Sequence, residues 1–285
     1  NPDLCPPNEM ADTCWHYIIS TSGPLVTLLT PPSGAVSSCN DQNIMFRITD
    51  GNGVDSASIR LNVNGTIYTI SDPELSFYND TLEFTPSSLW SDGDTVVAVL
   101  TRADDMVGMS SPDVPESVVF VIDLSPPYVA SLHPPARSGF ASAGSTITIV
   151  LTDDIAGVNP ATINLRIDGL LFTYPSGDMR YSNDTLTFSV SGMGYIPYDG
   201  ESLLICVNAM DMPTLCSPNL MGDYCFKYFY DFTGPIIIML FPYDSVWTSC
   251  YDTMKWRLYD ISGIDTSSIL LIVDGDSCDL SSSAV

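Results

Sequence analysis

Short stretches of alternating apolar and polar residues run along the whole chain, and they predict β-strands. The clearest of them follow an acidic loop and recur about every 105 residues, in segments that begin at Asp50, Asp154 and Asp260. An Asn-Gly or Asp-Gly dipeptide follows each strand and predicts a tight hairpin turn, because glycine accepts positive φ. The apolar residues occupy every second position and therefore share one face: Ile59, Leu61, Val63; Ile163, Leu165, Ile167; Ile269, Leu271 and Val273.

Each of these segments belongs to a longer repeat of about seven short strands separated by turn residues. No stretch of the sequence shows helical periodicity. We therefore expect an all-β protein of tandem Ig-like β-sandwich domains in an extended array, with partial sandwiches at both ends. The expected divisions are a C-terminal strand or strands of a preceding or neighbouring domain (1–23), two complete domains (24–125 and 126–233) and the N-terminal half of another (234–285).

Half a sandwich leaves an apolar face and a sheet edge uncovered, which should not persist alone. Two explanations fit this expectation. The chain is a segment of a longer repeat array, or residues 1–23 of a neighbouring chain complete the half-domain by strand addition.

The charge is strongly one-sided, with 34 Asp and Glu against nine Lys and Arg and a formal net charge of −25. Nucleic acids and anionic membranes are bound by cationic surfaces, so neither is expected as a partner. The excess of carboxylates favours solubility and cation binding. The sequence contains no apolar run long enough for a membrane-spanning helix, so we expect no membrane insertion.

Eight cysteines point to an oxidising, extracellular setting. Two Cys-x8-Cys pairs recur at matching places in the repeat, and Cys278 follows Cys250 in the last partial repeat. We expect disulfides within three pairs: Cys5 and Cys14, Cys216 and Cys225, Cys250 and Cys278. A zinc site is the alternative for the Cys-x8-Cys pairs, but each pair would need two further ligands. Cys206 is left open as a partner of Cys39 or Cys278 or as a buried thiol, because connectivity cannot be read from sequence.

The repeat pattern can be written D-x-x-G-[VI]-[DN]-x-x-[ST]-I-x-L-x-[VI]-[DN]-G, followed by [FY]-x-x-x-T-L-x-F, D-G-[DE] and a strand that ends in A-x-D. It resembles the tandem Ig-like repeats of large bacterial extracellular surface proteins and adhesins. The resemblance covers the whole chain and implies an extracellular stalk or filament. It names no ligand, and the Cys-x8-Cys insertions depart from a simple run of identical modules.

Acidic loops are the most specific candidates for a ligand site. In an Ig-like sandwich the incoming linker, the loop after the second strand and the loop before the last strand lie at one end. Carboxylates gathered there could supply the oxygen ligands of Ca²⁺, whereas Asp in turns also bonds its own backbone. The candidate ligands are Asp50, Asp55, Asp104 and Asp105 in the first repeat, Asp123, Asp153, Asp154 and Asp211 in the second, and Asp231, Asp260 and Asp265 in the third.

Three sequons, at Asn64, Asn79 and Asn183, fall at predicted turns and are candidate glycosylation sites. The two histidines, His16 and His133, lie in no motif that would pair them with a nucleophile, and no phosphate loop or His-Glu metal motif is present. We therefore expect no enzyme activity and no cofactor beyond Ca²⁺.

The sequence thus predicts a structural, extracellular filament or cell-surface stalk. Its expected partners are further copies of itself, joined head to tail, or further repeats of a longer chain. The alternative is an adhesin module that binds a cell-surface glycan or protein through its loops.

Overall fold

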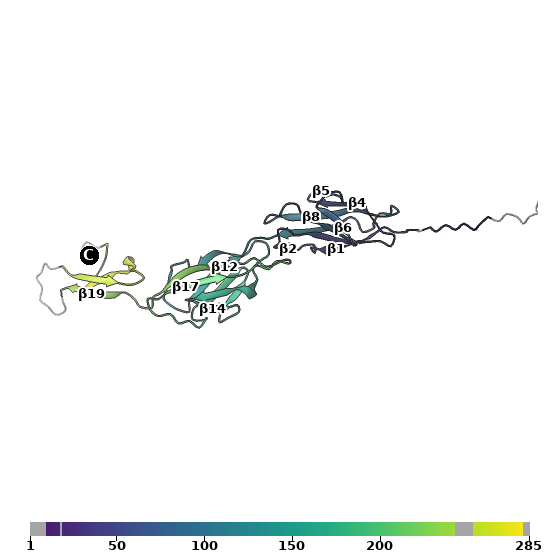
Figure 1. Ribbon diagram of the computed structural model, residues 1–285. Helices are drawn as coiled ribbons and strands as arrows, with labels where there is room; N and C mark the ends of the chain where they lie inside the picture. Colours follow the sequence, from purple (N-terminus) through teal and green to yellow (C-terminus); the bar gives the residue numbers. More distant parts are fainter. Residues whose placement is uncertain (1–9, 18, 243–252, 282–285) are drawn as a thin grey trace, which may run out of the picture. The chain divides into compact units, whose positions relative to one another are not determined.

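The computed structural model describes residues 10–17, 19–242 and 253–281, which form β-strands joined by turns and loops (Figure 1). The described residues up to Leu124, together with Pro213–Ser217, form one compact unit. Those of Ser125–Met212 and from Pro218 onward form a second. The chain therefore leaves the first unit at Leu124, returns at Pro213 and leaves again at Ser217.

The first unit is a sandwich of two sheets, with strand orders β1-β3-β7-β6 and β2-β9-β8-β4-β5. Its strands are β1 (Leu25–Thr30), β2 (Val36–Ser37), β3 (Ile44–Thr49), β4 (Val54–Val63), β5 (Thr66–Tyr68), β6 (Leu75–Tyr78), β7 (Thr81–Phe84), β8 (Thr95–Asp105) and β9 (Glu116–Ile122). Neighbouring strands are antiparallel except β2, which pairs with β9 in parallel.

The core of this sandwich is built by alternation along the strands. In β3, Ile44, Phe46 and Ile48 are fully buried, and the residues between them are exposed or half-buried. Across the ladder Phe46 pairs with Leu82 of β7, which is also fully buried. Two sheets that each bury one face in this way form a continuous apolar core between them.

The second unit contains the same sandwich, with sheets in the order β10-β12-β16-β15 and β11-β18-β17-β13-β14. Its strands are β10 (Tyr128–His133), β11 (Gly139–Phe140), β12 (Thr146–Thr152), β13 (Asn164–Ile167), β14 (Leu170–Thr173), β15 (Arg180–Ser182), β16 (Thr185–Ser189), β17 (Ser202–Asn208) and β18 (Tyr224–Tyr230). A short 3-10 turn, η1 (Pro160–Thr162), precedes β13. Strand for strand, the order repeats that of the first unit.

A third, smaller set of strands follows β18 in the second unit. It has two two-stranded sheets: β19 (Ile236–Phe241) pairs with β20 (Lys255–Tyr259), and β21 (Leu270–Val273) pairs with β22 (Asp276–Asp279), with the 3-10 turn η2 (Thr266–Ser268) between them. These strands repeat the first strands of each complete sandwich. All six residues of β19 are exposed, because no described strand covers them.

The strands predicted after the three acidic loops are all present, and the predicted turns close three hairpins. Val63 pairs with Thr66, Ile167 with Leu170 and Val273 with Asp276, so each turn has two residues with positive φ. The expected apolar face is buried in the first two copies. In the third the expectation is wrong: Ile269 and Leu271 are half-buried and Val273 is exposed, since the covering strands are not among those described.

The stretch that contains the Thr-Leu-x-Phe motif forms a hairpin. The stretch Tyr78–Phe84 turns at Asn79 and Asp80, whose φ values are 47° and 62°, and this turn joins β6 to β7. Asn183 and Asp184 make the same turn between β15 and β16. Asn and Asp adopt this left-handed conformation more readily than other residues with a Cβ atom, which explains their place there.

Candidate functional site

Among the acidic residues at the start of β4 and in the loops before β13 and β21, some only shape the local backbone and others also face another carboxylate. Asp55 accepts a hydrogen bond from the backbone N–H of Ala57 at 3.0 Å. Asp265 caps η2 and accepts from the N–H of Ser267 at 2.9 Å. Their carboxylates shape the local backbone, which is the ordinary role of Asp in a turn.

Asp104 has a partner of its own. The Nε and Nη2 atoms of Arg102 donate to its Oδ2 at 2.9 Å and 2.5 Å, and the Ser110 hydroxyl donates to Oδ1 at 2.7 Å. The hydrogen bond from Arg102 is the main reason why the pKa of the Asp104 carboxyl lies below its usual value. The charge of Asp104, an expected Ca²⁺ ligand, is therefore balanced by the guanidinium of Arg102.

Asp105 and Asp211 hold equivalent positions in the two units: Asp105 is the last residue of β8, and Asp211 follows shortly after the end of β17. Val54 pairs with Asp105, and Val158 forms a bridge to Asp211. Both side chains are buried. The acidic loop and the loop before the last strand thus meet in each unit, as the sequence predicts.

In the first unit, Asp105 organises its own loop. Its Oδ1 accepts from the backbone N–H groups of Val107 and Met109 at 3.0 Å and 2.7 Å. Burial favours the neutral acid, but these hydrogen bonds and the nearby Ser20 outweigh it, and the pKa of Asp105 is lowered. The Oδ2 atom is buried and has no hydrogen-bond partner among the described residues.

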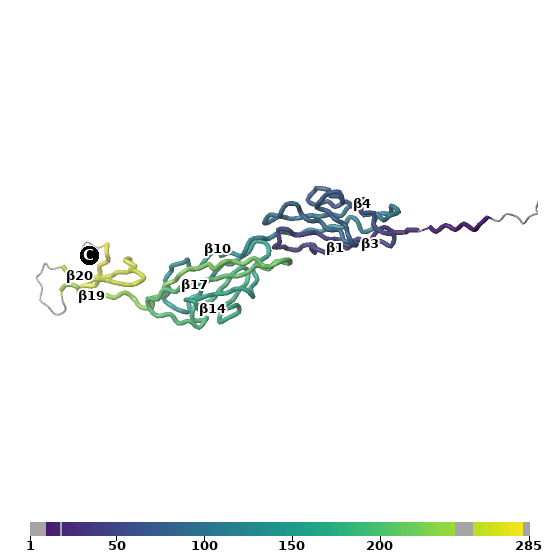
Figure 2. Tube along the Cα trace, viewed as in Figure 1, coloured from purple at the N-terminus to yellow at the C-terminus, as the bar shows by residue number. Residues whose placement is uncertain are grey.

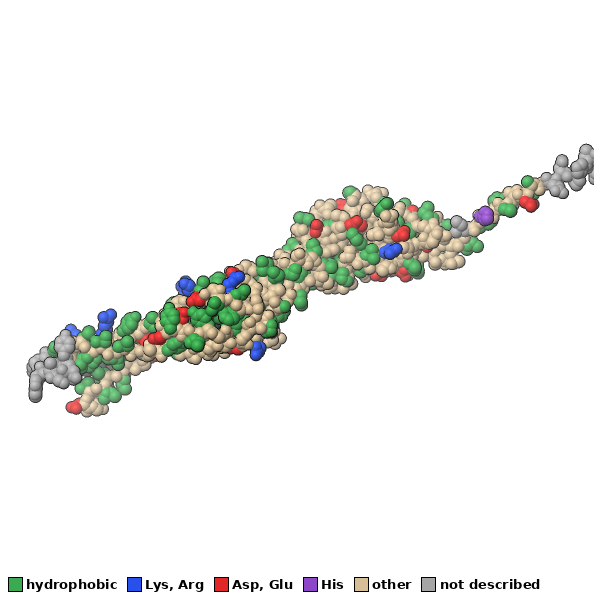
Figure 3. All heavy atoms as spheres, turned by 60° about the horizontal axis from the view of Figure 1, so that its bottom comes forward, with side chains coloured by type: hydrophobic (Ala, Val, Ile, Leu, Met, Phe, Trp, Pro, Cys, Tyr) green, Lys and Arg blue, Asp and Glu red, His purple; other side chains and the backbone are tan. Residues whose placement is uncertain are grey.

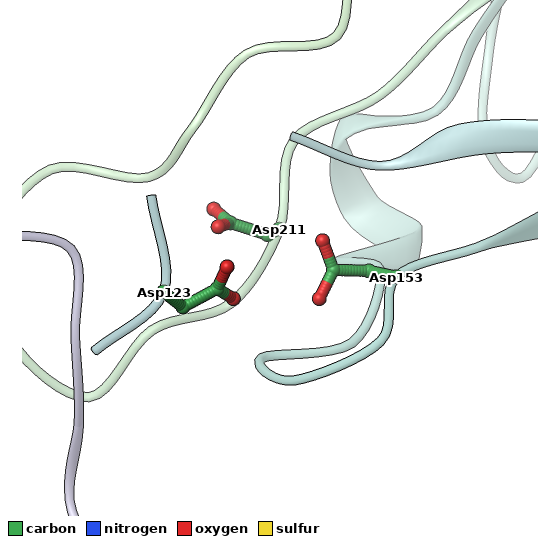
Figure 4. Close-up of side chains that lie close together, drawn as sticks. All are labelled: Asp123, Asp153 and Asp211. Carbon is green, nitrogen blue, oxygen red and sulfur yellow. The ribbon is translucent and has the colours of Figure 1, made fainter. Parts of the chain in front are cut away.

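In the second unit, Asp153 and Asp211 face each other (Figure 4), with carboxylate oxygens within 4.8 Å. Asp211 accepts from the backbone and side-chain N–H groups of Asn219, both at 2.6 Å. Burial, with the charge of Asp153 adding to it, raises the pKa of Asp211. Asp153 accepts from the N–H groups of Ile155 and Gly157 at 3.1 Å and 2.9 Å.

The other acidic candidates are placed as follows. Asp123, also labelled in Figure 4, belongs to the first unit, where its N–H donates to the carbonyl of Ser37 at 2.9 Å. Asp154 is exposed and accepts from the Tyr128 hydroxyl at 3.1 Å. Asp50 accepts from the N–H of Asn52 at 2.7 Å.

Asp231 and Asp260 lie close together in the second unit. The pKa of Asp260 is lowered, chiefly by the hydroxyl and N–H of Ser262 and also by a hydrogen bond involving Asp231. Ca²⁺ at these carboxylates stays a prediction, as does the inclusion of Asp123.

The disulfides correct the sequence analysis. Cys206 is bonded to Cys225, its direct partner across the β17–β18 ladder. Cys39 is bonded to Cys216, and the two are 177 residues apart in sequence. The expected Cys216–Cys225 bond is therefore wrong, and Cys206 is neither a partner of Cys39 or Cys278 nor a buried thiol.

The remaining expected pairs reach beyond the described residues. Cys14 and Cys278 have no disulfide partner in the part of the chain that the structure describes. Cys5 and Cys250, the partners expected for them, lie outside the described residues.

The segment around Cys216 belongs to the first unit. The N–H groups of Thr214 and Leu215 donate to the carbonyl of Val36 at 2.8 Å and 3.1 Å, and the N–H of Ser38 donates to the carbonyl of Leu215 at 3.2 Å. Leu215 also packs against the core of the first sandwich. We call residues 213–217 the clasp: backbone hydrogen bonds hold this segment to β2, and a disulfide bonds it to Cys39, just after β2.

The three sequon asparagines are exposed and stand in hairpin turns with positive φ. Asn64 also accepts from the N–H of Val97 at 2.8 Å through its Oδ1. These positions are accessible, and their glycosylation stays a prediction. Lys and Arg side chains are few and scattered on the face drawn in Figure 3.

No family model matches the sequence, and no curated protein matches it either. Solved structures with tandem immunoglobulin domains resemble it at 11–14% identity. Domains 1–5 of Sidekick-1 match with 14% identity and a TM-score of 0.35 over 77% of this chain and 42% of that one. The insect immune protein hemolin matches with 13% identity and a TM-score of 0.29 over 74% and 47%.

The N-terminal Ig1-2 module of the Drosophila receptor protein tyrosine phosphatase DLAR matches with 11% identity and a TM-score of 0.22 over 72% of this chain and 97% of that one. The chain spans 38% of a tri-modular endo-β-1,4-glucanase from Bacillus licheniformis, which it resembles at 11% identity and a TM-score of 0.31. The strand order, which is the same in both units, establishes the class of the fold: this is an all-β chain of tandem Ig-like sandwiches. The described residues include no helix long and apolar enough to cross a membrane.

Proposed function

We propose that this chain is a structural, non-enzymatic part of an extracellular stalk or filament, of the kind found in bacterial surface proteins and adhesins. Three features support this role: the same sandwich occurs twice in one chain, each unit carries a disulfide, and the sequence has few bases. Disulfides form and persist in oxidising compartments, which supports an extracellular location.

The observation that carries the proposal is the Cys39–Cys216 bond. It joins the loop between β2 and β3 of the first unit to a residue 177 positions further along the chain. The shortest covalent path from one end of the protein to the other therefore passes directly from Cys39 to Cys216. Tension applied to the two ends bypasses the intervening residues, including strands β10–β17 of the second sandwich.

Such a bypass suits a protein that must keep its length under load. While the disulfide is intact, force on the chain ends does not act along the backbone of the strands in the bypassed segment. The clasp of residues 213–217 on β2 adds hydrogen bonds at the same point.

Head-to-tail association is the second part of the proposal. The exposed apolar strands of the third repeat supply a surface on which further repeats or further copies can pack. Electron microscopy of the purified protein over a range of concentrations tests this. Chains of joined particles that lengthen with concentration are expected, and single particles at every concentration would contradict it.

A further inference from the structure

Residues 13–19 carry the same pattern as β18, the last strand of the second sandwich. Aligned at Cys14 and Cys225, both segments read Asp, one residue, Cys, aromatic, base or imidazole, Tyr. The alignment places Trp15, Tyr17 and Ile19 at the positions of Phe226, Tyr228 and Tyr230. The shared pattern therefore predicts the same division into an inward and an outward face.

In β18 the inward face is core. Phe226, Tyr228 and Tyr230 are 5%, 0% and 0% exposed and belong to the hydrophobic cluster of the second unit. Phe140 packs against both tyrosines, with ring centroids 4.9 Å and 5.4 Å away. This face is what fixes β18 in the sandwich.

The side chains at the matching positions near the N-terminus are exposed to solvent. Trp15, Tyr17 and Ile19 are 72%, 84% and 82% exposed, and residues 10–17 run as an extended trace with no strand beside them (Figure 2). Exposing two aromatic residues and an isoleucine on one side of an extended segment is costly in water. Covering such side chains is worth about 1.5–3 kcal/mol each.

Cys14 gives the inference a second, independent support. Its counterpart, Cys225, is bonded to Cys206 of the neighbouring strand β17. Cys14 itself is exposed and has no disulfide partner among the described residues. The N-terminal segment thus has a cysteine and an apolar face at the same spacing as β18. In β18 the cysteine forms the disulfide to β17 and the apolar face packs in the core.

We propose that residues 12–20 serve as the last strand of another Ig-like sandwich of the same type. That sandwich has its other strands but lacks a last strand of its own. The segment pairs antiparallel with the penultimate strand of that sandwich, buries Trp15, Tyr17 and Ile19, and bonds Cys14 to a cysteine at the position of Cys206. The partner is thus another copy of the repeat, on the same polypeptide or another one. The assignment depends on the sandwich fold and not on the structural role proposed above.

The covalent step is a thiol oxidation. Cys14 and its partner lose two protons and two electrons and form one S–S bond, and a small-molecule disulfide such as oxidised glutathione is reduced to two thiols. Pairing of the strands brings the two sulfur atoms together first, as the ladder does for Cys206 and Cys225.

A strand exchange within the full chain tests whether the segment has β18 character. The variant carries the sequence of residues 13–19 in place of β18: Tyr224→Thr, Phe226→Trp, Lys227→His, Phe229→Ile and Tyr230→Ile. We expect a folded second unit with its Cys206–Cys225 bond and a melting temperature lowered by a few degrees. The control variant has the same amino-acid composition, but Trp and His trade places: it carries Phe226→His and Lys227→Trp with the other three substitutions unchanged. We expect it to lose the cooperative unfolding transition of the second unit. Equal damage in both variants would overturn the assignment.

A chain extension tests the docking itself. Residues 125–219, with Cys216→Ser in the added copy, are placed before Glu9 of the full chain, and the protein is refolded with oxidised and reduced glutathione. We expect slowed amide hydrogen exchange in residues 13–19 and a disulfide-linked peptide that joins Cys14 to the added Cys206. Trp15→Asp with Tyr17→Asp should abolish both, whereas His16→Ser should not. Unchanged fast exchange with a freely alkylated Cys14 would overturn the proposal, and so would a link from Cys14 to another cysteine.

If the extended protein fails to fold, a second extension decides the outcome. In it, the sequence of residues 224–230 replaces that of residues 13–19. A folded added sandwich with this sequence, but not with residues 13–19, would count against the proposal.

Discussion

Cys39, between β2 and β3, is bonded to Cys216, in a segment that returns to the first unit after the strands of the second. Their Cα atoms are 5.8 Å apart, although 177 residues separate them in sequence. A second bond, Cys206–Cys225, joins neighbouring strands only 19 residues apart. The two disulfides therefore differ mainly in the length of chain that they close.

Removal of the long-range bond should cost more stability than removal of the short one. On chain entropy alone, a disulfide that closes the longer loop is worth about 5 kcal/mol and one that closes the shorter loop about 3 kcal/mol, both upper estimates. We expect Cys39→Ser to lower the denaturation midpoint of the first unit, and Cys206→Ser to lower that of the second unit by less. Urea unfolding followed by a probe in each unit measures this, and the opposite ranking would contradict the entropic account.

Leu82 and Leu186 occupy equivalent positions in β7 and β16, and both are fully buried. Replacing either with alanine should cost about 2–5 kcal/mol, because it removes buried methyl groups and leaves a cavity. Each substitution should affect the transition of its own unit, since each sandwich has its own core. Calorimetry can resolve the two transitions. Val97→Ala, at an exposed strand position, is the control and should have little effect.

Asn64 holds the turn between β4 and β5 at a φ of 48° and accepts a hydrogen bond from Val97. Asn64→Ala should destabilise the first unit by about 2 kcal/mol, the sum of a strained left-handed backbone and a lost hydrogen bond. Asn64→Gly loses only the hydrogen bond and should cost about half as much. Chemical denaturation of the three proteins distinguishes the two contributions, and equal losses would show that φ does not matter here.

The pair Asp153 and Asp211 gives a pH dependence of defined sign. The pKa of Asp211 is higher in the folded state, so its contribution to stability is fully present below its unfolded pKa, near 4, and is lost as pH rises through the folded value. Asp153→Asn keeps an oxygen for Ile155 and Gly157 but removes the charge. It should raise the free energy of unfolding at pH 7 by up to about 1 kcal/mol and lower the pKa of Asp211.

Asp154→Asn is the matched control for Asp153→Asn, because it makes the same change in net charge at an exposed neighbour. Urea unfolding at pH 7 and pH 4, with NMR titration of Asp211, gives both quantities. Equal effects of the two substitutions would rule out a specific interaction. Adding EGTA to the wild-type protein tests the calcium prediction in the same assay, and an unchanged midpoint would count against bound Ca²⁺.

Local patterns predicted the sandwich well, because alternation and turn chemistry act over a few residues. The faces of β4 and β13 and the Asn-Gly and Asp-Gly hairpins needed only the sequence around them. The Cys206–Cys225 bond could have been found in the same way. Leu203, Ile205 and Val207 are buried, so Cys206 faces away from the core, on the same side of the sheet as Cys225.

The Cys39–Cys216 bond had no such local signal. It depends on residues 213–217 packing against β2 within the first unit, a contact between segments far apart in sequence. The acidic loops were only partly predictable for a related reason. Asp in a turn looks the same in sequence whether it only caps a backbone N–H, as Asp265 does, or also faces another carboxylate, as Asp153 does.

Single-molecule extension of the full chain from its two ends measures whether the Cys39–Cys216 bond lies in the load path. With the disulfides intact, the fully extended length should be shorter than that of the reduced protein by the 177 residues that Cys39–Cys216 bypasses, or roughly 600 Å. Cys206→Ser with Cys225→Ser should leave the oxidised length unchanged, whereas Cys39→Ser should recover most of the difference. Equal extended lengths for the oxidised and reduced proteins would contradict the account.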